Sequence, residues 1–187
     1  MTFSEKENEF ELIQHIKKGN SSAMKELYNH YIKYLTAVCS RYIISNADLK
    51  DVLQESFIKI FTAIDTFEYR GAGSLKAWMT RIVVNESLKF IKKNERFEFV
   101  ENEWDLPEAA NEEDYVPDTD DISIHVIQEM IRQLPTGYRT VFNLYIFENK
   151  SHKEIASILE IKENTSTSQL HKAKQRLAEK INEYKKS

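Results

Sequence analysis

The stretch SHKEIASILEIKENTSTSQLHKAKQRL, residues 151–177, predicts two short helices that are separated by a tight joint. Its apolar residues recur at helical spacing on either side of the joint, which is placed at residues 160–163. The residues expected to face inward are Ile155, Ala156 and Leu159 in the first helix and Leu170, Ala173 and Leu177 in the second. Two amphipathic helices at so short a joint favour a helix-turn-helix over an ordinary pair of surface helices in a bundle.

The other face of the second helix begins with small hydrogen-bonding side chains and continues with cations. This order suits a recognition helix that enters the major groove of duplex DNA with its N-terminus first. The residues expected to point outward are Thr165, Ser166, Ser168, Gln169, Lys172 and Arg176.

Charge divides the sequence into two basic parts and an acidic part between them. Residues 97–121 contain 11 acidic residues and no basic one, whereas residues 1–96 carry 15 Lys and Arg against 12 Asp and Glu. Residues 122–187, which include the motif, carry 11 basic residues against 7 acidic ones. Because salt screens charges beyond about 8–10 Å, local charge decides what a polyanion experiences. The formal net charge of −4 therefore does not argue against nucleic acid as a partner.

The expected fold is all-α, with two small helical domains joined by an acidic linker. The domains are assigned to residues 1–96 and 122–187 and the linker to residues 97–121, and the C-terminal domain carries the helix-turn-helix. Gly and Pro lie between the periodic segments, and no alternating run of β-branched residues predicts a strand. The helices expected in the first domain run from a Ser4–Glu7 capping box to Gly19, from Ser21 or Ser22 onward, from Ala47 behind an Asn46 N-cap to Thr66, and from Ser74 to about Glu95.

The helix expected at residues 47–66 has an unusual polar face. Opposite its apolar stripe lie Asp48, Asp51, Gln54, Glu55 and Lys59, at i, i+3 and i+4 spacing. A solvated surface is the ordinary interpretation of such a face, and the repulsion between acidic side chains one turn apart is an argument for a basic partner. The face lacks the Glu-x-x-His pattern of a helical metal site.

A loop with two glycines, residues 69–74, leads into the next helix, and aromatic residues interleave with bases around it. The aromatic residues are Phe67, Tyr69 and Trp78, and the bases are Arg70, Lys76 and Arg81, with Lys89 further along the helix. Stacking platforms beside cations suit single-stranded nucleic acid. For Trp78, which stands four residues before Ile82, packing in the core is the alternative.

In this order the motifs resemble those of bacterial RNA polymerase sigma factors, in the two-domain extracytoplasmic-function group of the sigma-70 family. The resemblance extends from about Leu12 to Leu177. It is carried by DLKDVLQESFIKIF at residues 48–61, FEYRGAGSLKAWMTRIVVN at residues 67–85, LPTGYRTVF at residues 134–142 and the helix-turn-helix.

The resemblance implies three interfaces and their partners. Asp48, Asp51, Gln54, Glu55 and Lys59 would dock on core RNA polymerase. Tyr69, Arg70, Lys76, Trp78, Arg81, Asn85 and Lys89 would contact the melted minus-ten strand of promoter DNA. Thr165, Ser166, Ser168, Gln169, Lys172 and Arg176 would contact the minus-thirty-five duplex. An anti-sigma factor is a further implied partner, and the free chain is expected to be a monomer.

The helix-turn-helix departs from the family pattern at its joint. Glu160 stands where a Gly is common, and Lys162 replaces a small capping residue. Because Lys cannot cap, Asn164 or Thr165 is expected to cap instead and to move the helix start by two or three residues. Asn149 stands at another position where a Gly is expected, and it tolerates a left-handed conformation.

Other functions are less well supported by the sequence. The five His residues form no ligand cluster, and no nucleophile–base pair or glycine-rich phosphate loop is present, so we expect no catalytic residue, metal site, cofactor or small-molecule substrate. The single Cys39 is expected to be a small buried hydrophobe. No signal peptide or membrane span is predicted, which favours a cytoplasmic protein. The alternative function is a stand-alone helix-turn-helix regulator that acts as a dimer without polymerase.

Overall fold

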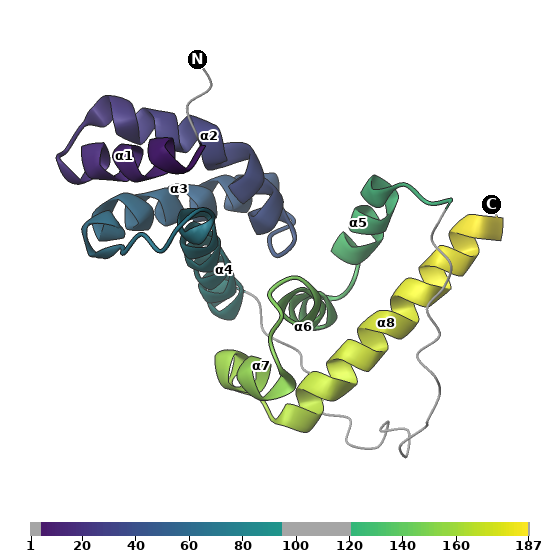
Figure 1. Cartoon of the computed structure of the whole chain (residues 1–187). Helices are drawn as coiled ribbons and strands as arrows, with labels where there is room; N and C mark the ends of the chain where they lie inside the picture. Colours follow the sequence, from purple (N-terminus) through teal and green to yellow (C-terminus); the bar gives the residue numbers. More distant parts are fainter. Residues whose placement is uncertain (1–4, 95–120, 187) are drawn as a thin grey trace. The chain divides into compact units, whose positions relative to one another are not determined.

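The computed structural model describes residues 5–94 and 121–186 of the 187-residue chain. All regular elements in these two ranges are helices (Figure 1), which confirms the all-α expectation. The chain divides into two compact units, Met1–Glu95 and Arg96–Ser187. The predicted Ser4–Glu7 capping box and residues 97–120 of the predicted acidic linker lie outside what the structure describes.

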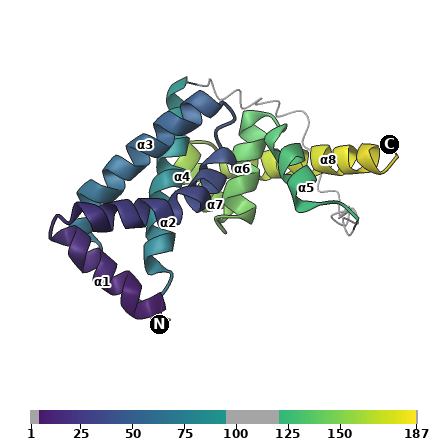
Figure 2. The same cartoon turned by 90° about the horizontal axis from the view of Figure 1, so that it is seen from above.

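The first unit is built around its last helix. Its elements are α1 (Glu5–Lys17), α2 (Ser21–Ser40), α3 (Asn46–Ala63), the 3₁₀ turn η1 (Ile64–Thr66) and α4 (Ser74–Asn94). Helix α4 packs against both α2 and α3, and α2 also contacts α1 and α3 (Figure 2). The side chains fully shielded from solvent include Leu27, Leu35, Val38, Ile60, Leu75, Met79, Val83 and Ile91. Each of α2, α3 and α4 thus contributes one apolar stripe to a shared core.

The first residues of α2 and α3 are capped one position earlier than predicted. Asn20, rather than Ser21 or Ser22, caps α2, because its side chain accepts hydrogen bonds from two backbone N–H groups of the first turn, at 2.9 and 3.1 Å. Ser45, rather than Asn46, caps α3, and its Oγ accepts from a first-turn N–H at 3.4 Å. Both capping residues have the extended backbone that this position requires, so the predicted caps were wrong.

The second unit is built around α8. In residues 121–186 its helices are α5 (Ile124–Arg132), α6 (Thr136–Ile146), α7 (His152–Leu159) and α8 (Glu163–Lys186). Helix α8 contacts α5, α6 and α7 along its length (Figure 1). One apolar cluster of this unit consists of Ile122, Met130, Ile131, Leu134, Ala173, Leu177 and Ile181.

A buried arginine fixes the turn between α5 and α6. The Arg139 side chain is 2% exposed, and its Nη1 donates to the carbonyl oxygens of Leu134 at 2.7 Å and Arg132 at 3.2 Å. Its Nη2 lies 3.4 Å from the Thr136 hydroxyl, to which it also donates. A buried charge left without such partners would cost several kcal/mol, so these hydrogen bonds hold the turn in one geometry.

Helices α7 and α8 form the predicted helix-turn-helix. Helix α7 starts with a capping box in which Ser151 Oγ accepts from the Glu154 N–H at 3.3 Å and the Glu154 carboxylate accepts from the Ser151 N–H at 2.9 Å. The backbone hydrogen bond from Ser151, with a further one from the Lys150 ammonium, lowers the pKa of Glu154 to about 2. Ile155 and Leu159 are buried as expected.

The turns before and after α7 both use left-handed backbone without glycine. Asn149 and Glu160 have φ angles of 52° and 59°, so the expectation for Asn149 is confirmed. Helix α8 starts at Glu163, and the Ser166 N–H donates to the Lys162 carbonyl at 3.2 Å. The expected displacement of the helix start was wrong, because the backbone of Lys162 takes the capping position whatever its side chain is.

Replacing Glu160 with glycine should stabilise the second unit. A residue with a Cβ in the left-handed region costs about 1 kcal/mol or more, and glycine avoids this strain while losing part of the gain to its greater unfolded-state entropy. We expect Glu160→Gly to raise the free energy of unfolding by roughly 0.5 kcal/mol. The measurement is hydrogen exchange at the amides of α7 and α8 in the full chain. Asn149→Gly is the control and should change less; a decrease for Glu160→Gly would contradict the argument.

Candidate functional site

The polar face of α3 is exposed and contains one apolar residue. Asp51, Gln54 and Glu55 are exposed, and Asp48 is half-buried at the start of the helix. Ile58 follows Gln54 and Glu55 by one turn and is 48% exposed. The sequence prediction missed Ile58 because it collected only polar residues, although the spacing of Ile58 from them was the available signal.

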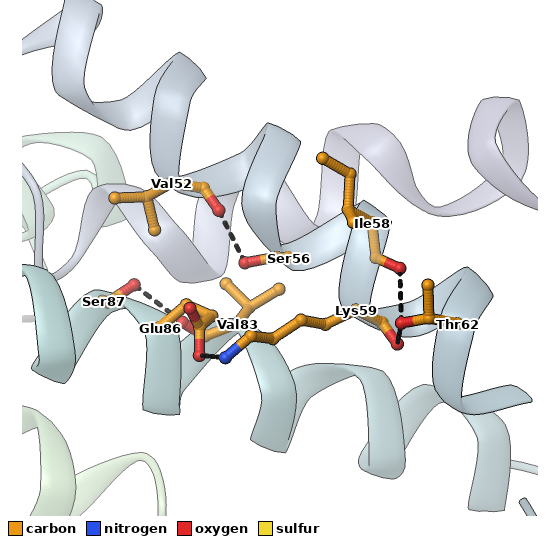
Figure 3. Close-up of polar contacts among 8 residues, drawn as sticks. All are labelled: Val52, Ser56, Ile58, Lys59, Thr62, Val83, Glu86 and Ser87. Atoms are coloured by element: carbon orange, nitrogen blue, oxygen red, sulfur yellow. Dashed lines mark hydrogen bonds and ion pairs between the residues drawn. The ribbon is translucent and has the colours of Figure 1, made fainter. Parts of the chain in front are cut away.

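Lys59 turns toward α4 rather than joining the exposed acids. Its Nζ lies 2.5 Å from Oε1 of Glu86 in α4, whose side chain is 11% exposed, whereas Ile58 points away from α4 (Figure 3). Nearby, Ser56 of α3 and Ser87 of α4 are fully buried, and each hydroxyl donates to a carbonyl one turn earlier, at 2.7 and 2.8 Å. The Ser87 hydroxyl also lies 3.6 Å from the Sγ atom of Cys39 in α2. The Lys59–Glu86 ion pair connects α3 directly to α4.

The loop between η1 and α4, residues 67–73, has a defined shape. Gly71 and Gly73 have φ angles of 102° and 83°, a region that residues with a Cβ rarely adopt. The Ser74 hydroxyl donates to the Gly71 carbonyl at 2.6 Å and accepts from the Arg70 N–H at 3.2 Å. The Arg70 side chain is 79% exposed and therefore projects from a folded loop.

The aromatic residues around this loop are partly covered by their neighbours. Phe67 is buried, and its ring centroid lies 4.9 Å from that of the half-buried Trp78. Trp78 thus contributes to packing, which is the alternative that the sequence left open. The half-buried Tyr69 lies with its ring centroid 5.5 Å from that of Phe10 in α1.

Helix α4 presents a row of polar side chains that begins beside the loop. Arg81, Asn85 and Lys89 are exposed and follow one another at intervals of one turn. At the start of the helix, the exposed Lys76 places its Nζ 4.1 Å above the centre of the Tyr34 ring, a cation–π contact. Apart from Trp78, the predicted residues of α4 therefore lie at its accessible surface.

The first half of α8 does not present all of the predicted residues. Those that remain accessible are Thr165, Ser168, Lys172 and Arg176. Ser166 is fully buried and Gln169 is only 3% exposed, so the prediction that these two residues point outward was wrong.

Ser166 and Gln169 belong to the buried stripe of α8. They precede Leu170 and Ala173 by four residues, or one turn, and the stripe is wide because α8 packs against three other helices. The Ser166 hydroxyl is paired with Nδ1 of His152 in α7 at 2.9 Å. The prediction placed Ser166 and Gln169 on the outer face because they are polar. Their spacing from Leu170 and Ala173 would have placed them in the buried stripe.

A row of four exposed residues in the first half of α8 was not predicted. They are Asn164, Thr167, His171 and Gln175, which recur at helical spacing. Their row is the most accessible part of the first half of α8, and they are candidates for contacts with a partner. The signal that could have found them is the same spacing, counted outward from the apolar stripe.

His152 joins the three helices around the joint. Besides bonding to Ser166, its ring stacks on Tyr145 of α6 with a centroid distance of 4.9 Å. Partial burial lowers the pKa of His152, and Lys174 acts in the same direction, whereas Glu163 opposes them. The neutral imidazole is therefore favoured at the helix-turn-helix.

Further expectations concern a thiol, a metal and a membrane. Cys39 is fully buried as expected, and burial raises the pKa of its thiol. Across residues 5–94 and 121–186, no three His, Cys, Asp or Glu side chains are grouped in a way that could hold a metal ion. None of the described helices is both long and apolar enough to cross a membrane.

Comparison with known protein families gives a match in each of the two units. The family described as Sigma-70 region 2 matches residues 27–97, and the family described as Sigma-70, region 4 matches residues 124–177. Together they take in 125 of the 187 residues. The chain belongs to the sigma-70 family.

Curated relatives place this sigma factor in the extracytoplasmic-function (ECF) group. The ECF RNA polymerase sigma-E factor of Haemophilus influenzae is 28% identical over 181 residues, which cover 91% of this chain and 93% of the relative. The sigma-E factor of Escherichia coli K12 is 27% identical over 181 residues, with coverages of 91% and 92%. A solved complex of the sigma factor RpoE with the anti-sigma factor NepR from Bartonella quintana is 21% identical, with coverages of 84% and 96% and a TM-score of 0.49.

The two matched regions contain all three candidate surfaces of the sigma factor. The region 2 match includes α3, the loop at residues 67–73 and α4, and the region 4 match extends from α5 to Leu177 of α8. Helix α1 lies outside both matches.

The Lys59–Glu86 pair should couple α3 to α4 measurably. We expect a double-mutant cycle of Lys59→Met and Glu86→Gln to give a coupling free energy of about 1 kcal/mol, because one partner is largely shielded from solvent. Urea unfolding of the full chain provides the measurement, in a Trp104→Phe background so that Trp78 reports on the first unit. Additivity of the two single changes would show that the pair does not hold the helices together.

The lowered pKa of His152 should make the second unit less stable in mild acid. The unfolded chain binds a proton near the ordinary value of 6.5, whereas the folded chain binds it only at lower pH. The free energy of unfolding should therefore fall as the pH drops from 6.5 toward the folded pKa and level off below it. Hydrogen exchange at α7 and α8 measures this. His152→Asn should reduce the slope of the free energy of unfolding against pH. His171→Asn, at an exposed site, serves as the control. Equal slopes in both variants would show that His152 is not the cause of the pH dependence.

Proposed function

We propose that this sigma factor binds core RNA polymerase through α3 and directs initiation at promoters that its two units read together. In this proposal the domain of residues 1–96 binds core polymerase and the minus-ten strand. The domain of residues 122–187 binds the minus-thirty-five duplex, and residues 97–121 link the two domains.

The observation that carries the proposal is the exposed face of α3. Asp51, Gln54 and Glu55 are exposed on α3, and the exposed Ile58 follows Gln54 and Glu55 by one turn, so the face combines polar and negatively charged side chains with one apolar side chain. This composition is typical of a protein-binding surface, and its negative charge complements a basic partner. We assign Asp48 to the edge of this face and Lys59 to a supporting role, because Lys59 is engaged with Glu86.

The surface proposed for the minus-ten strand comprises the loop and the adjoining side of α4. Its exposed members are Arg70, Lys76, Arg81, Asn85 and Lys89. These cations and the amide suit phosphates and unpaired bases. The half-buried Tyr69 and Trp78 would offer their remaining ring surface to a base.

The surface proposed for the minus-thirty-five duplex is the accessible side of the first half of α8. It includes Thr165, Ser168, Lys172 and Arg176, and we add Asn164, Thr167 and His171 because they are exposed on the same half. Hydroxyl and amide groups near the start of the helix suit base edges, and the cations suit phosphates. Ser166 and Gln169 would support the helix from its buried side.

A dimeric regulator without polymerase is the weaker alternative. It would account for the helix-turn-helix, but it gives no role to a region 2 unit with an exposed acidic helix. We place the sigma factor in the cytoplasm with its polymerase, acting in transcription without a catalytic residue of its own. An anti-sigma factor remains a prediction that follows from family membership alone.

Reversal of one charge on α3 should impair polymerase binding specifically. We expect Asp51→Arg to weaken the affinity of the full chain for its core polymerase at least about tenfold, because it opposes a basic partner with a like charge. Fluorescence anisotropy of the labelled chain measures this affinity. The matched control is Glu26→Arg, which makes the same charge change at an exposed position of α2. Equal affinities for both variants, or no binding by the unaltered chain, would refute the docking proposal.

A further inference from the structure

Helix α1 forms hydrogen bonds with the backbone at the start of the loop at residues 67–73. Lys17, the last residue of α1, donates from Nζ to the carbonyl oxygens of Asp65 at 3.1 Å and Phe67 at 2.8 Å. These carbonyls lie where η1 ends and the loop starts. A lysine ammonium can satisfy carbonyl groups that a helix end leaves without an intrahelical partner, so Lys17 fixes the entry of the loop.

A second set of contacts from α1 holds Tyr69 within the loop. The Phe10 ring packs against the Tyr69 ring, and the Glu9 carboxylate lies close enough to the Tyr69 hydroxyl to raise its pKa. The same carboxylate accepts from the Tyr31 hydroxyl of α2 at 2.8 Å. The pKa of Tyr69 is raised, mainly by desolvation and to a smaller extent by the nearby Glu9. The Tyr69 hydroxyl therefore stays protonated and able to donate a hydrogen bond. One carboxylate thus connects α1, α2 and the loop.

These contacts are separate from the packing that attaches α1 to the unit. Ile13 and Ile16 are 1% and 2% exposed, and they bury the apolar side of α1. Phe10 and Lys17 instead direct their contacts to the loop and its entry, and Glu9 contacts both the loop and Tyr31 of α2. The polar contacts can therefore be removed by substitution while the apolar packing of α1 is retained.

We propose that α1 is a positioning element for promoter-strand capture, with Lys17 and Glu9 holding the loop at residues 67–73 in its capturing shape. The inference rests on the proposed function, which assigns the melted strand to this loop. Lys17 and Glu9 act through the loop and do not touch DNA. Arg70 projects into solvent, where its Nη2 forms an exposed ion pair with Glu68 at 3.2 Å, whereas Tyr69 is packed against Phe10 of α1. Because α1 precedes residue 27, this role lies outside the matched region 2.

The test compares Lys17→Met with Lys18→Met in the full chain bound to core polymerase. Lys18 is the next residue, is exposed, and loses the same charge. A promoter duplex is first selected from a random library by transcription. The fluorescent base 2-aminopurine is then placed in its minus-ten segment, and the rise in fluorescence as the strands separate gives the rate of promoter opening. We expect Lys17→Met to slow promoter opening about tenfold, because two charge-assisted hydrogen bonds to the loop entry are lost. The affinity of this variant for core polymerase should stay unchanged. Lys18→Met should behave as the unaltered chain, and Lys17→Arg should recover most of the rate.

The outcomes separate this inference from the function on which it rests. Opening by Lys17→Met at the unaltered rate would overturn the inference and leave the proposed function intact. Failure of the unaltered chain to open any DNA would overturn the proposed function. If Lys17→Met also loses polymerase binding, Glu9→Ala is compared with Glu11→Ala, an exposed acid of the same helix. Slower opening by Glu9→Ala alone supports the inference, and equal rates overturn it.

Discussion

The packing of α4 against α2 and α3 determines which surfaces the first unit can offer to partners. Leu75, Met79 and Val83 of α4 are shielded completely from solvent. The Lys59–Glu86 pair connects α3 directly to α4. Because α3 buries its apolar stripe in this core, its acidic side must face outward. The same burial places the start of α4, and with it the end of the loop that we assign to the melted strand.

Helix α8 is the central helix of the second unit, and its burial narrows the surface available for DNA. Contacts with three helices cover a wide stripe of α8, which includes the polar residues Ser166 and Gln169. The pairing of Ser166 with His152 shows how a polar residue within the stripe can connect the two helices of the motif. We therefore expect duplex specificity to arise from the residues on the opposite side of α8, including Thr167 and His171, which the sequence pattern alone did not single out.

Periodicity and helix-terminating residues predict much of this fold, because each helix buries an apolar stripe and several helices begin or end beside a Gly, Pro or N-cap residue. The helix expected from Ser74 to about Glu95 is observed as Ser74–Asn94, and the acidic face of α3 has the predicted phase. Contacts between distant residues could not be predicted in this way. Periodicity shows which side of a helix is buried but not which neighbour covers it. The bond from Lys17 to Asp65 spans 48 residues, and the Lys59–Glu86 bond spans 27.

The most direct test of the central claim is transcription by the cognate core polymerase from a random-sequence DNA library, with and without this chain. If the chain is a promoter-reading sigma factor, transcripts should appear only in its presence. The DNA upstream of their start sites should share two short elements, one for each unit. Transcription no higher than that of core polymerase alone, together with binding of the isolated chain to duplex DNA as a dimer, would contradict the account and favour a stand-alone regulator.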